Sequence, residues 1–401
     1  ILPAIAYEKT GPSLIIAYLI AALLVVPAML SKIELATAMP RSGGAYFFIY
    51  RSLGPLFGTF SGFAAWLSLA LKSAFALVGI GVFLSPLIGE VSPATIKLIA
   101  VGFTFGFTLL NLFSVHKSGR FQVILVIGLL SILLFYIGSG FQGINVERFE
   151  PFNTGGWLNI FSATGMIFVS FGGLTKIASI AEEIKDPVKT IPRGMIASFV
   201  TVTLVYLLAV FVTTGLLDRS VFIGSFAPLS EGAKQITGMW GYYALSVAAM
   251  LAFITTGNSG LLAASRNPLA MARDNLLPPI FSKVNVKLKT PVVSIIFTSL
   301  FMIGCILLLD LEQLVKVAST MKLLLFTFVN ISVILMRESR IVSYKPAFRS
   351  PFYPWIQIIG SLFYILLIID MGALPLAITG GFFLLSLLWY LAYSRSRNNR
   401  D

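Results

Sequence analysis

Long apolar runs separated by short polar connections recur along the whole chain. About 20 apolar residues are enough to cross a bilayer as an α-helix. A short apolar fragment opens the chain at 1–7, and full-length runs follow at 12–31, 56–86, 94–113, 121–141, 157–180, 194–217, 240–264, 290–309, 313–336, 351–370 and 372–393. Transmembrane β-strands would instead alternate apolar and polar residues over ~10 positions. The pattern therefore predicts an all-α integral membrane protein with about 11 full spans and a partial first helix.

Composition excludes a soluble domain of this size. Hydrophobic residues make up 57% of the 401 residues and charged residues only 11%, whereas a soluble domain carries about 25% charged residues. The chain has too few polar groups to cover a water-exposed surface. We expect the lipid bilayer to be its surroundings.

The net charge of +13 reflects topology and not nucleic-acid binding. If the predicted connections alternate between the two sides, most Lys and Arg residues fall on one side. The other side carries only Lys9, Lys97, Arg148, Arg219, Lys234 and Lys316. Because basic connections stay in the cytoplasm, the sequence predicts a multi-pass plasma-membrane protein whose basic loops and C-terminal tail, 394–401, are cytoplasmic. No nucleic-acid partner is expected.

Two apolar segments are interrupted. One is the opening Ile1-Leu2-Pro3, and the other is Ser170-Phe171-Gly172-Gly173-Leu174. A glycine inside a helix costs about 1 kcal/mol relative to alanine. The glycines either allow close helix packing or mark an unwound segment that lines a polar cavity. Interrupted helices in corresponding positions of two repeats point to a transporter binding site, and these two lie five helices apart.

Four motifs, in order along the chain, carry a family resemblance. They are Glu34–Tyr46 (ELATAMPRSGGAY), Phe171–Thr175 with the following Ala181–Arg193, Ala272–Asn285, and Tyr344–Pro354. Each resembles a segment of the amino acid–polyamine–organocation superfamily, at the end of helix 2, at helix 6 and its loop, after helix 8 and before helix 11. The resemblance extends over essentially the whole membrane domain, 1–393.

The resemblance implies a five-plus-five inverted-repeat transporter fold with two further helices. The first repeat would be 1–141, the second 157–336, and the additional helices 351–393. It implies a secondary transporter that moves amino acids or related amines by alternating access. In this family the break in helix 1 lies just upstream of a segment like Ile1-Leu2-Pro3. The chain is therefore expected to lack the start of its first helix and, as written, not to transport.

The resemblance also places half of a substrate site. The helix 6 wall would be formed by Phe168, Val169, Ser170, Phe171, Gly172, Gly173 and Leu174. Phe168 or Phe171 would be an aromatic lid over the substrate, or else ordinary packing. The family often has an acidic residue where Thr175 stands, which leaves the preferred substrate charge open.

Two sites are candidates for coupling substrate transport to an ion gradient. Lys72 lies near the centre of the long third helix, where a charged side chain is costly and is usually functional; it could exchange a proton or pair with an anionic substrate group. Ala252, Thr255 and Thr256 share one face of their helix and resemble half of a sodium site. The threonines could equally bond back to their own helix. Na⁺ coupling, H⁺ coupling and exchange all remain open, and no other cofactor or metal is expected.

Charged residues after the glycine pair suggest a gate. Glu182, Glu183 and Arg193 are candidates for a cytoplasmic gate, although a solvated loop has the same composition. An enzyme is not expected, because the single histidine and single cysteine, His116 and Cys305, form no reactive cluster. A disulfide-linked heavy subunit is not expected, because the loop at 89–96 has no cysteine. A sensor or scaffold with a permease fold would share every motif, and only flux would separate it.

Overall fold

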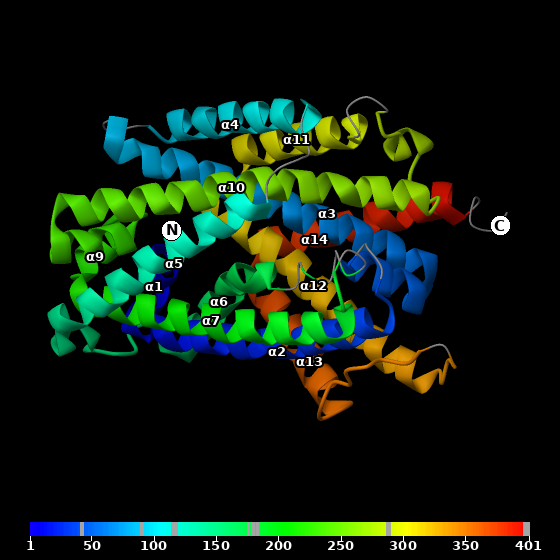
Figure 1. Ribbon diagram of the computed structural model, residues 1–401, viewed down its shortest axis with the longest axis horizontal. Helices are drawn as coiled ribbons and strands as arrows, with labels where there is room; N and C mark the ends of the chain where they lie inside the picture. Colours follow the sequence, from blue (N-terminus) through cyan, green and yellow to red (C-terminus); the bar gives the residue numbers. More distant parts are fainter. Residues whose placement is uncertain are drawn as a thin grey trace.

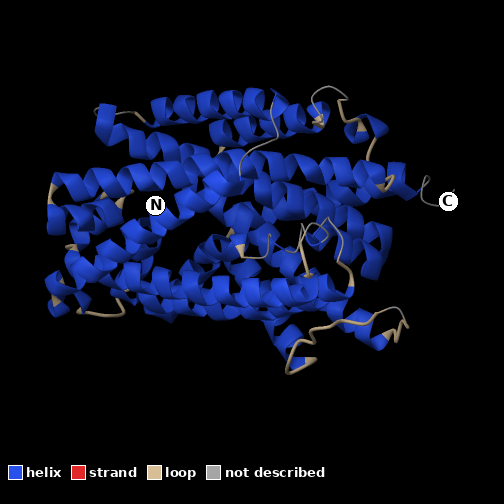
Figure 2. Ribbon diagram, viewed as in Figure 1, coloured by secondary structure: helices blue, strands red, loops and turns tan. Residues whose placement is uncertain are grey.

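The computed structural model describes residues 1–40, 44–88, 92–113, 119–174, 177, 181, 184–285, 290–342 and 344–395. Every regular element in these ranges is a helix (Figure 2). The long helices are α2 (Leu14–Ala38), α3 (Gly44–Ile88), α4 (Pro93–Phe113), α5 (Gly119–Gly140), α7 (Pro187–Leu216), α10 (Met239–Arg273), α11 (Val292–Leu308), α12 (Leu311–Glu338), α13 (Trp355–Asp370) and α14 (Ala373–Trp389).

Shorter elements join or interrupt these helices. They are α1 (Leu2–Thr10), α6 (Gly156–Ile167), α8 (Arg219–Gly224), α9 (Pro228–Thr237), the 3₁₀ helices η1 (Gly11–Ser13), η2 (Phe141–Gly143), η3 (Val146–Phe149), η4 (Phe168–Gly173) and η7 (Pro279–Ser282), and the π-helical η8 (Tyr390–Ser394).

The helix lengths confirm the prediction of a multi-span membrane protein. Within the described ranges, 8 helical stretches are long and apolar enough to cross a membrane, and α11 and α13 are shorter apolar helices. The first of these stretches, Leu2–Ala38, contains α1, η1 and α2. Many large apolar side chains on the outer helices are exposed, as in Phe135 and Leu300. Such a surface is stable in lipid and not in water.

The structure differs from the predicted spans at several places. Helix α3 begins at Gly44, and its chain turns at Gly54, whose φ of 85° is outside the helical range. The predicted span 56–86 is therefore only the part of α3 after this turn. Helix α10 continues to Arg273 and includes Pro268, although its last residues were predicted as a polar connection. Helices α8 and α9 lie in a connection for which the apolar pattern predicted no element.

Most of the long helices run roughly along the longest axis of the molecule, among them α2, α4, α7, α10 and α11, while α5 crosses this direction obliquely (Figure 1). Helix α3 lies at the centre and packs extensively against α10 and against α12. Helices α2 and α7 pack together on one side, and α4 and α11 on the opposite side. Small residues allow the central contacts, since a side chain at Gly260 of α10 would overlap Ser73 of α3.

The bundle has two ends, the Thr10 end and the Ala38 end. The Thr10 end holds the end of α1 and the start of α12. The Ala38 end holds the end of α2, the end of α12 and the start of α7. The Ala38 end is the one that the basic connections predict to be cytoplasmic.

Candidate functional site

The α6–η4 segment changes its helix type in the middle of the bundle. Regular α-helix ends at Ile167, and a 3₁₀ helix follows over Phe168–Gly173. The irregularity therefore begins before the predicted interruption at 170–174, and it is a tighter helix instead of an unwound chain. A 3₁₀ stretch inside a longer helix often marks a hinge or a functional site. The carbonyl oxygen of Val169 accepts a hydrogen bond from Lys72 Nζ at 3.2 Å.

A cavity of about 380 Å³ lies against this segment. Val169 and Ser170 form part of its wall, with α1, α3, α5, α7, α10 and α12 forming most of the remainder. Its walls are mainly aliphatic and aromatic, and Lys72 is the only charged side chain among the described residues that line it. Small-molecule sites are typically mainly apolar cavities with a few polar groups.

Only part of the predicted helix 6 wall faces this cavity. Of the seven predicted residues, Val169 and Ser170 line it. The other five lie outside the described lining: Phe168, Phe171, Gly172, Gly173 and Leu174.

Both candidate lid residues pack inside the bundle. Phe168 is fully buried, with its ring 5.4 Å from that of Phe326 and 5.7 Å from that of Tyr364. Phe171 lies 5.4 Å from the ring of Tyr206. In this conformation both phenylalanines hold η4 against its neighbours and neither covers the cavity.

The coupling candidates lie on two sides of the cavity. Lys72 lines it from α3, and Ala252 and Thr256 line it from α10. Thr255 is outside the lining, and its hydroxyl donates to the Ala252 carbonyl at 2.9 Å. This is the back-bonding that the sequence allowed as an alternative to ion binding.

Of the gate candidates, only Arg193 can be placed. It lies near the start of α7 with its side chain exposed. Glu182 and Glu183 lie outside the described residues.

Two further intramembrane lysines lie near the α6–η4 segment. The Nζ of Lys322 on α12 is 5.1 Å from the centre of the Phe326 ring, and that of Lys32 on α2 is 4.7 Å from it. Lys32 directly follows the predicted span 12–31, but it lies inside α2 and its exposed fraction is 3%. The place of Lys32 in the sequence, at the end of an apolar run, did not indicate that α2 continues to Ala38. It also did not indicate that Phe326 of α12 lies over the lysine.

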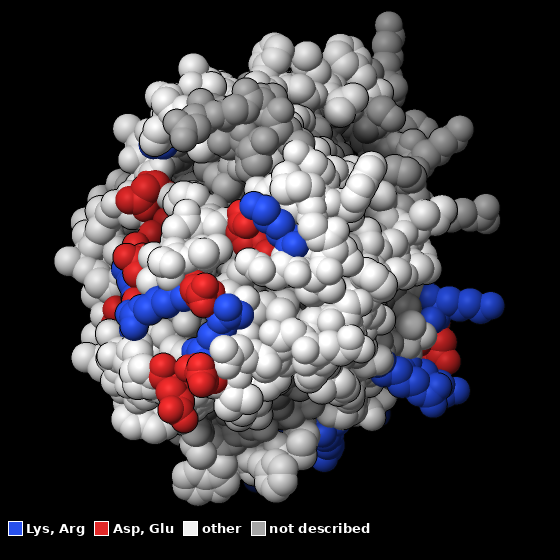
Figure 3. Space-filling view, turned by 90° about the vertical axis from the view of Figure 1, so that its left-hand side faces the viewer, with Lys and Arg blue, Asp and Glu red and all other residues white. Residues whose placement is uncertain are grey.

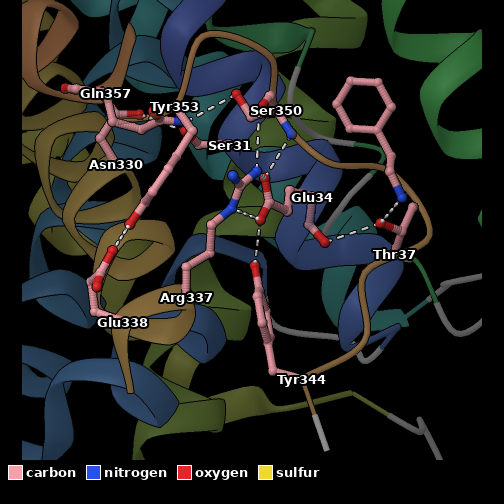
Figure 4. A network of polar contacts seen from close by, with 11 residues as sticks. Ser31, Glu34, Thr37, Asn330, Arg337, Glu338, Tyr344, Ser350, Tyr353 and Gln357 are labelled. Carbon is pink, nitrogen blue, oxygen red and sulfur yellow. Dashed lines mark hydrogen bonds and ion pairs between the residues drawn. The ribbon is translucent and has the colours of Figure 1, made fainter. Parts of the chain in front are cut away.

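A buried carboxylate at the Ala38 end was not predicted from sequence. Glu34 has no exposed surface, and Arg337 binds both of its oxygens, at 2.7 and 2.6 Å. The Tyr344 hydroxyl donates to Glu34 at 3.0 Å and the Ser350 backbone N–H at 2.8 Å. Figure 4 shows Arg337 of α12 and Tyr344 and Ser350 of the loop before α13 converging on Glu34 of α2.

This network ties three parts of the chain together. Burial and the Glu34 carboxylate raise the pKa of Tyr344, so its hydroxyl stays protonated and donates. A bidentate arginine–carboxylate contact is both strong and geometrically specific. The only sequence signal was the occurrence of Glu34 and Tyr344 in two of the family-like motifs, since the partner Arg337 lies outside both.

Other ion pairs connect elements at the Thr10 end. Lys9 of α1 lies 2.6 Å from Glu312 of α12, and Arg148 lies 3.0 Å from Asp218. The rings of Tyr7 and Phe222 stack, with centroids 4.0 Å apart. Figure 3 looks onto this end and shows basic and acidic side chains intermixed on a mostly uncharged face. The Lys9–Glu312 pair and the Tyr7–Phe222 stack hold α1 against α12 and α8, and Leu2 and Pro3 of α1 line the cavity.

A helical bundle with membrane-spanning lengths, a helix that changes type inside it and an apolar cavity beside that change are typical of a multi-pass membrane transporter. Comparison with known families agrees with this class. A family model described as "Amino acid permease" matches residues 1–393, and the chain belongs to this family. Its members are transporters and not enzymes.

Several curated proteins resemble the chain over most of their length. The branched-chain amino acid permease BcaP of Bacillus subtilis (strain 168) is 30% identical, covering 97% of this chain and 87% of that protein. The methylthioribose transporter of the same organism is 26% identical, covering 89% and 80%. BcaP of Lactococcus lactis subsp. cremoris is 26% identical, covering 99% and 90%. The cationic amino acid transporter 2, vacuolar, of Arabidopsis thaliana is 28% identical, covering 83% and 55%.

Proposed function

We propose that this protein is a secondary active transporter that carries amino acids with apolar side chains across the plasma membrane by alternating access. The observation that carries the proposal is the cavity of about 380 Å³ beside the 3₁₀ segment, with Val169 and Ser170 in its wall. A substrate held there would contact both a segment with irregular backbone bonding and the central helices α3 and α10.

The walls of the cavity support an apolar substrate side chain. Phe75, Phe253, Leu129 and Leu245 line it together with several alanines and valines. Each Å² of apolar surface that leaves water when a substrate binds to these walls contributes about 25 cal/mol to the binding free energy. The branched-chain permeases among the relatives carry such a substrate in their names.

Alternating access requires that the cavity open to one side at a time. The Lys9–Glu312 ion pair joins α1 to α12 at the Thr10 end, and the Glu34–Arg337 pair joins α2 to α12 at the Ala38 end. We infer that these contacts break and form as the two predicted repeats, 1–141 and 157–336, move against each other. The Ala38 end would face the cytoplasm.

The test is uptake by the full-length protein in proteoliposomes. Labelled leucine, isoleucine, glutamate and lysine are offered under a sodium gradient, under a proton gradient, and with preloaded substrate for exchange. Leucine and isoleucine should accumulate at least about tenfold faster than in empty liposomes. Sodium-driven uptake lost in Thr256→Val would assign coupling to α10, and proton-driven uptake lost in Lys72→Ala would assign it to α3.

A blocking variant with a matched control links flux to the cavity. Val169→Trp fills the cavity and should abolish uptake, whereas Val200→Trp, on the exposed surface of α7, should leave it unchanged. If no amino acid moved under either gradient or in exchange, the transport proposal would be wrong. A sensor built on the permease fold would then be the better explanation.

A further inference from the structure

A second cavity opens at the outer surface of the bundle, between α5, α9 and α10. Its volume is about 450 Å³, and its walls include Phe135 and Tyr136 of α5, Ala233 of α9, and Trp240 and Ala244 of α10. This cavity is called the outer groove. The side chains of Phe135 and Trp240 are 64% and 85% exposed, so the outer groove is open to the surroundings of the protein.

Small residues leave the space that forms the outer groove. Gly241 and Ala244 of α10 are three residues apart and so lie on one face of the helix. A Cβ at Gly241 would lie only 2.6 Å from the Ala233 carbonyl oxygen, which shows how closely α9 approaches α10. The groove therefore runs beside a tight helix contact that the glycine makes possible.

The chemistry of the outer groove suits a hydrocarbon chain. None of the described residues that line it is charged. The Tyr136 hydroxyl lies 2.7 Å from the Thr213 hydroxyl, and the Thr237 hydroxyl donates to the Ala233 carbonyl at 3.3 Å. With these hydroxyls already hydrogen-bonded inside the protein, the walls favour an apolar ligand over a charged one.

The position of the outer groove indicates where such a chain comes from. Helices α5 and α10 both belong to stretches long enough to cross the membrane, and exposed apolar side chains such as Leu134 and Val247 continue the surface next to the groove. Trp240 lies in the first turn of α10, at the same end of the bundle as α1 (Figure 1). Tryptophan is enriched at membrane–water interfaces. The opening therefore meets the lipid leaflet at the Thr10 end.

Leu245 connects the outer groove to the cavity of about 380 Å³. It lines both, although only 6% of its surface is exposed. Helices α5, α9 and α10 contribute to both walls, since Leu133, Leu229 and Ala249 line the larger cavity. The three helices thus form a partition between lipid and the larger cavity, and Leu245 belongs to both of its faces.

We propose that the outer groove binds one acyl chain of a bilayer phospholipid, and that Leu245 keeps this chain out of the larger cavity. A lipid chain is already in an apolar medium, so leaving water contributes nothing to its binding. The contribution comes from contacts with walls that would otherwise face an empty space. This inference goes beyond the proposed transport and does not depend on it.

Photocrosslinking to the purified full-length protein in detergent tests the proposal. The probe is a phosphatidylcholine with a diazirine in the middle of one acyl chain, added at a low ratio of lipid to protein. Adducts are mapped by mass spectrometry after proteolysis. We expect them at Phe135 and Trp240 at least about tenfold more often than on the exposed face of α14, because only a lipid held in a cavity keeps its contacts in detergent.

Filling the outer groove should displace the probe. Ala244→Phe places a ring in the groove, and the adducts at Phe135 should fall by about tenfold. Ala377→Phe is the matched control, since Ala377 is also exposed on a spanning helix, α14, but is not among the residues that line the groove. It should leave the adducts at Phe135 unchanged.

Shortening Leu245 tests the partition. In the unmodified protein no adduct should appear at Phe75 or Val169, which are buried and line only the larger cavity. Leu245→Ala should produce adducts there, and the milder Leu245→Val should produce fewer. Leu251→Ala, at an exposed position of the same helix, should produce none.

Three outcomes would overturn the proposal. Adducts spread evenly over the exposed faces of the bundle would mean that the outer groove binds no particular lipid chain, and so would unchanged labelling in Ala244→Phe. Labelling by a diazirine-bearing sterol but not by the phospholipid would mean that the occupant is a sterol. Adducts at Phe75 in the unmodified protein, or none there in either Leu245 variant, would contradict the role of Leu245. None of these results depends on whether amino acids are transported.

Discussion

Glu34 illustrates how a single buried charge is made acceptable inside this bundle. Its carboxylate has no exposed surface, and donors from α12 and from the loop before α13 surround it. Desolvating a carboxylate is expensive unless good hydrogen bonds replace the lost water. In this conformation the network therefore fixes the position of α2 relative to α12 more than it adds net stability.

Removing this charge should be costly. Glu34→Gln keeps the shape of the side chain but leaves Arg337 without its ionic partner, so we expect a loss of roughly 3 kcal/mol, seen as a lower unfolding temperature in detergent. Glu338→Gln is the control, because Glu338 is exposed and accepts a single tyrosine hydroxyl, from Tyr353 at 2.6 Å. It should cost less than about 1 kcal/mol. Equal losses in both variants would contradict this role for Glu34.

At the scale of elements, the turn at Gly54 decides how α3 is used. The φ of 85° and ψ of −178° at this residue belong to a region that is essentially restricted to glycine. The segment before it packs Tyr46 against the end of α10, where its hydroxyl contacts Asp274 at 2.6 Å. The segment after it crosses the bundle and presents Lys72 to the cavity. Gly54 thus allows α3 both to contact the end of α10 through Tyr46 and to bring Lys72 to the cavity.

Substitution at this turn should strain the backbone and not the packing. Apart from neighbouring atoms of the same chain segment, no atom lies within 4 Å of the position that a Cβ at Gly54 would take, so Gly54→Ala should destabilise by about 1–3 kcal/mol through its φ alone. Gly102→Ala is the matched control, since Gly102 also has open space but lies inside the regular helix α4. Alanine there should be neutral or stabilise by up to ~1 kcal/mol. Thermal unfolding of the two variants in detergent makes the comparison.

At the scale of the whole molecule, the arrangement of basic connections predicts the orientation in the membrane. The connections predicted to lie at the Ala38 end contain most of the Lys and Arg residues of the sequence, and the Thr10 end shows mixed charges (Figure 3). Basic connections are retained in the cytoplasm. The bundle should therefore sit with the Ala38 end inside the cell.

Cysteine labelling in intact cells tests this orientation. In a background with Cys305→Ser, Ser220→Cys lies in α8 at the Thr10 end and Ser339→Cys follows α12 at the Ala38 end, both at exposed positions. A membrane-impermeant maleimide should label position 220 at once, and position 339 only after permeabilisation. The reverse pattern would mean that the bundle is inverted. Labelling of both after permeabilisation confirms that the sites are reactive.

The sequence by itself determined the membrane architecture. Long apolar runs predicted spanning helices, because a bilayer accepts only segments that satisfy their own backbone hydrogen bonds. The motifs at Glu34–Tyr46, Phe171–Thr175, Ala272–Asn285 and Tyr344–Pro354 indicated the permease family that the comparisons then showed. The glycine pair at Gly172 and Gly173 correctly marked a region where regular α-helix is not maintained. These features are local or periodic, so the chain displays them without its fold.

Only the tertiary structure decided which side chains meet. Phe168 and Phe171 are both aromatic residues at positions where the sequence allowed a lid over the substrate. Both pack into the bundle, and Val169 and Ser170 line the cavity instead. Lys72 and Lys322 are 250 residues apart and converge on Gly172 because α3 and α12 pack beside η4. Glu34 and Arg337 meet across a similar separation. Contacts of this kind depend on how helices cross and rotate, and hydropathy along one chain contains no information about either.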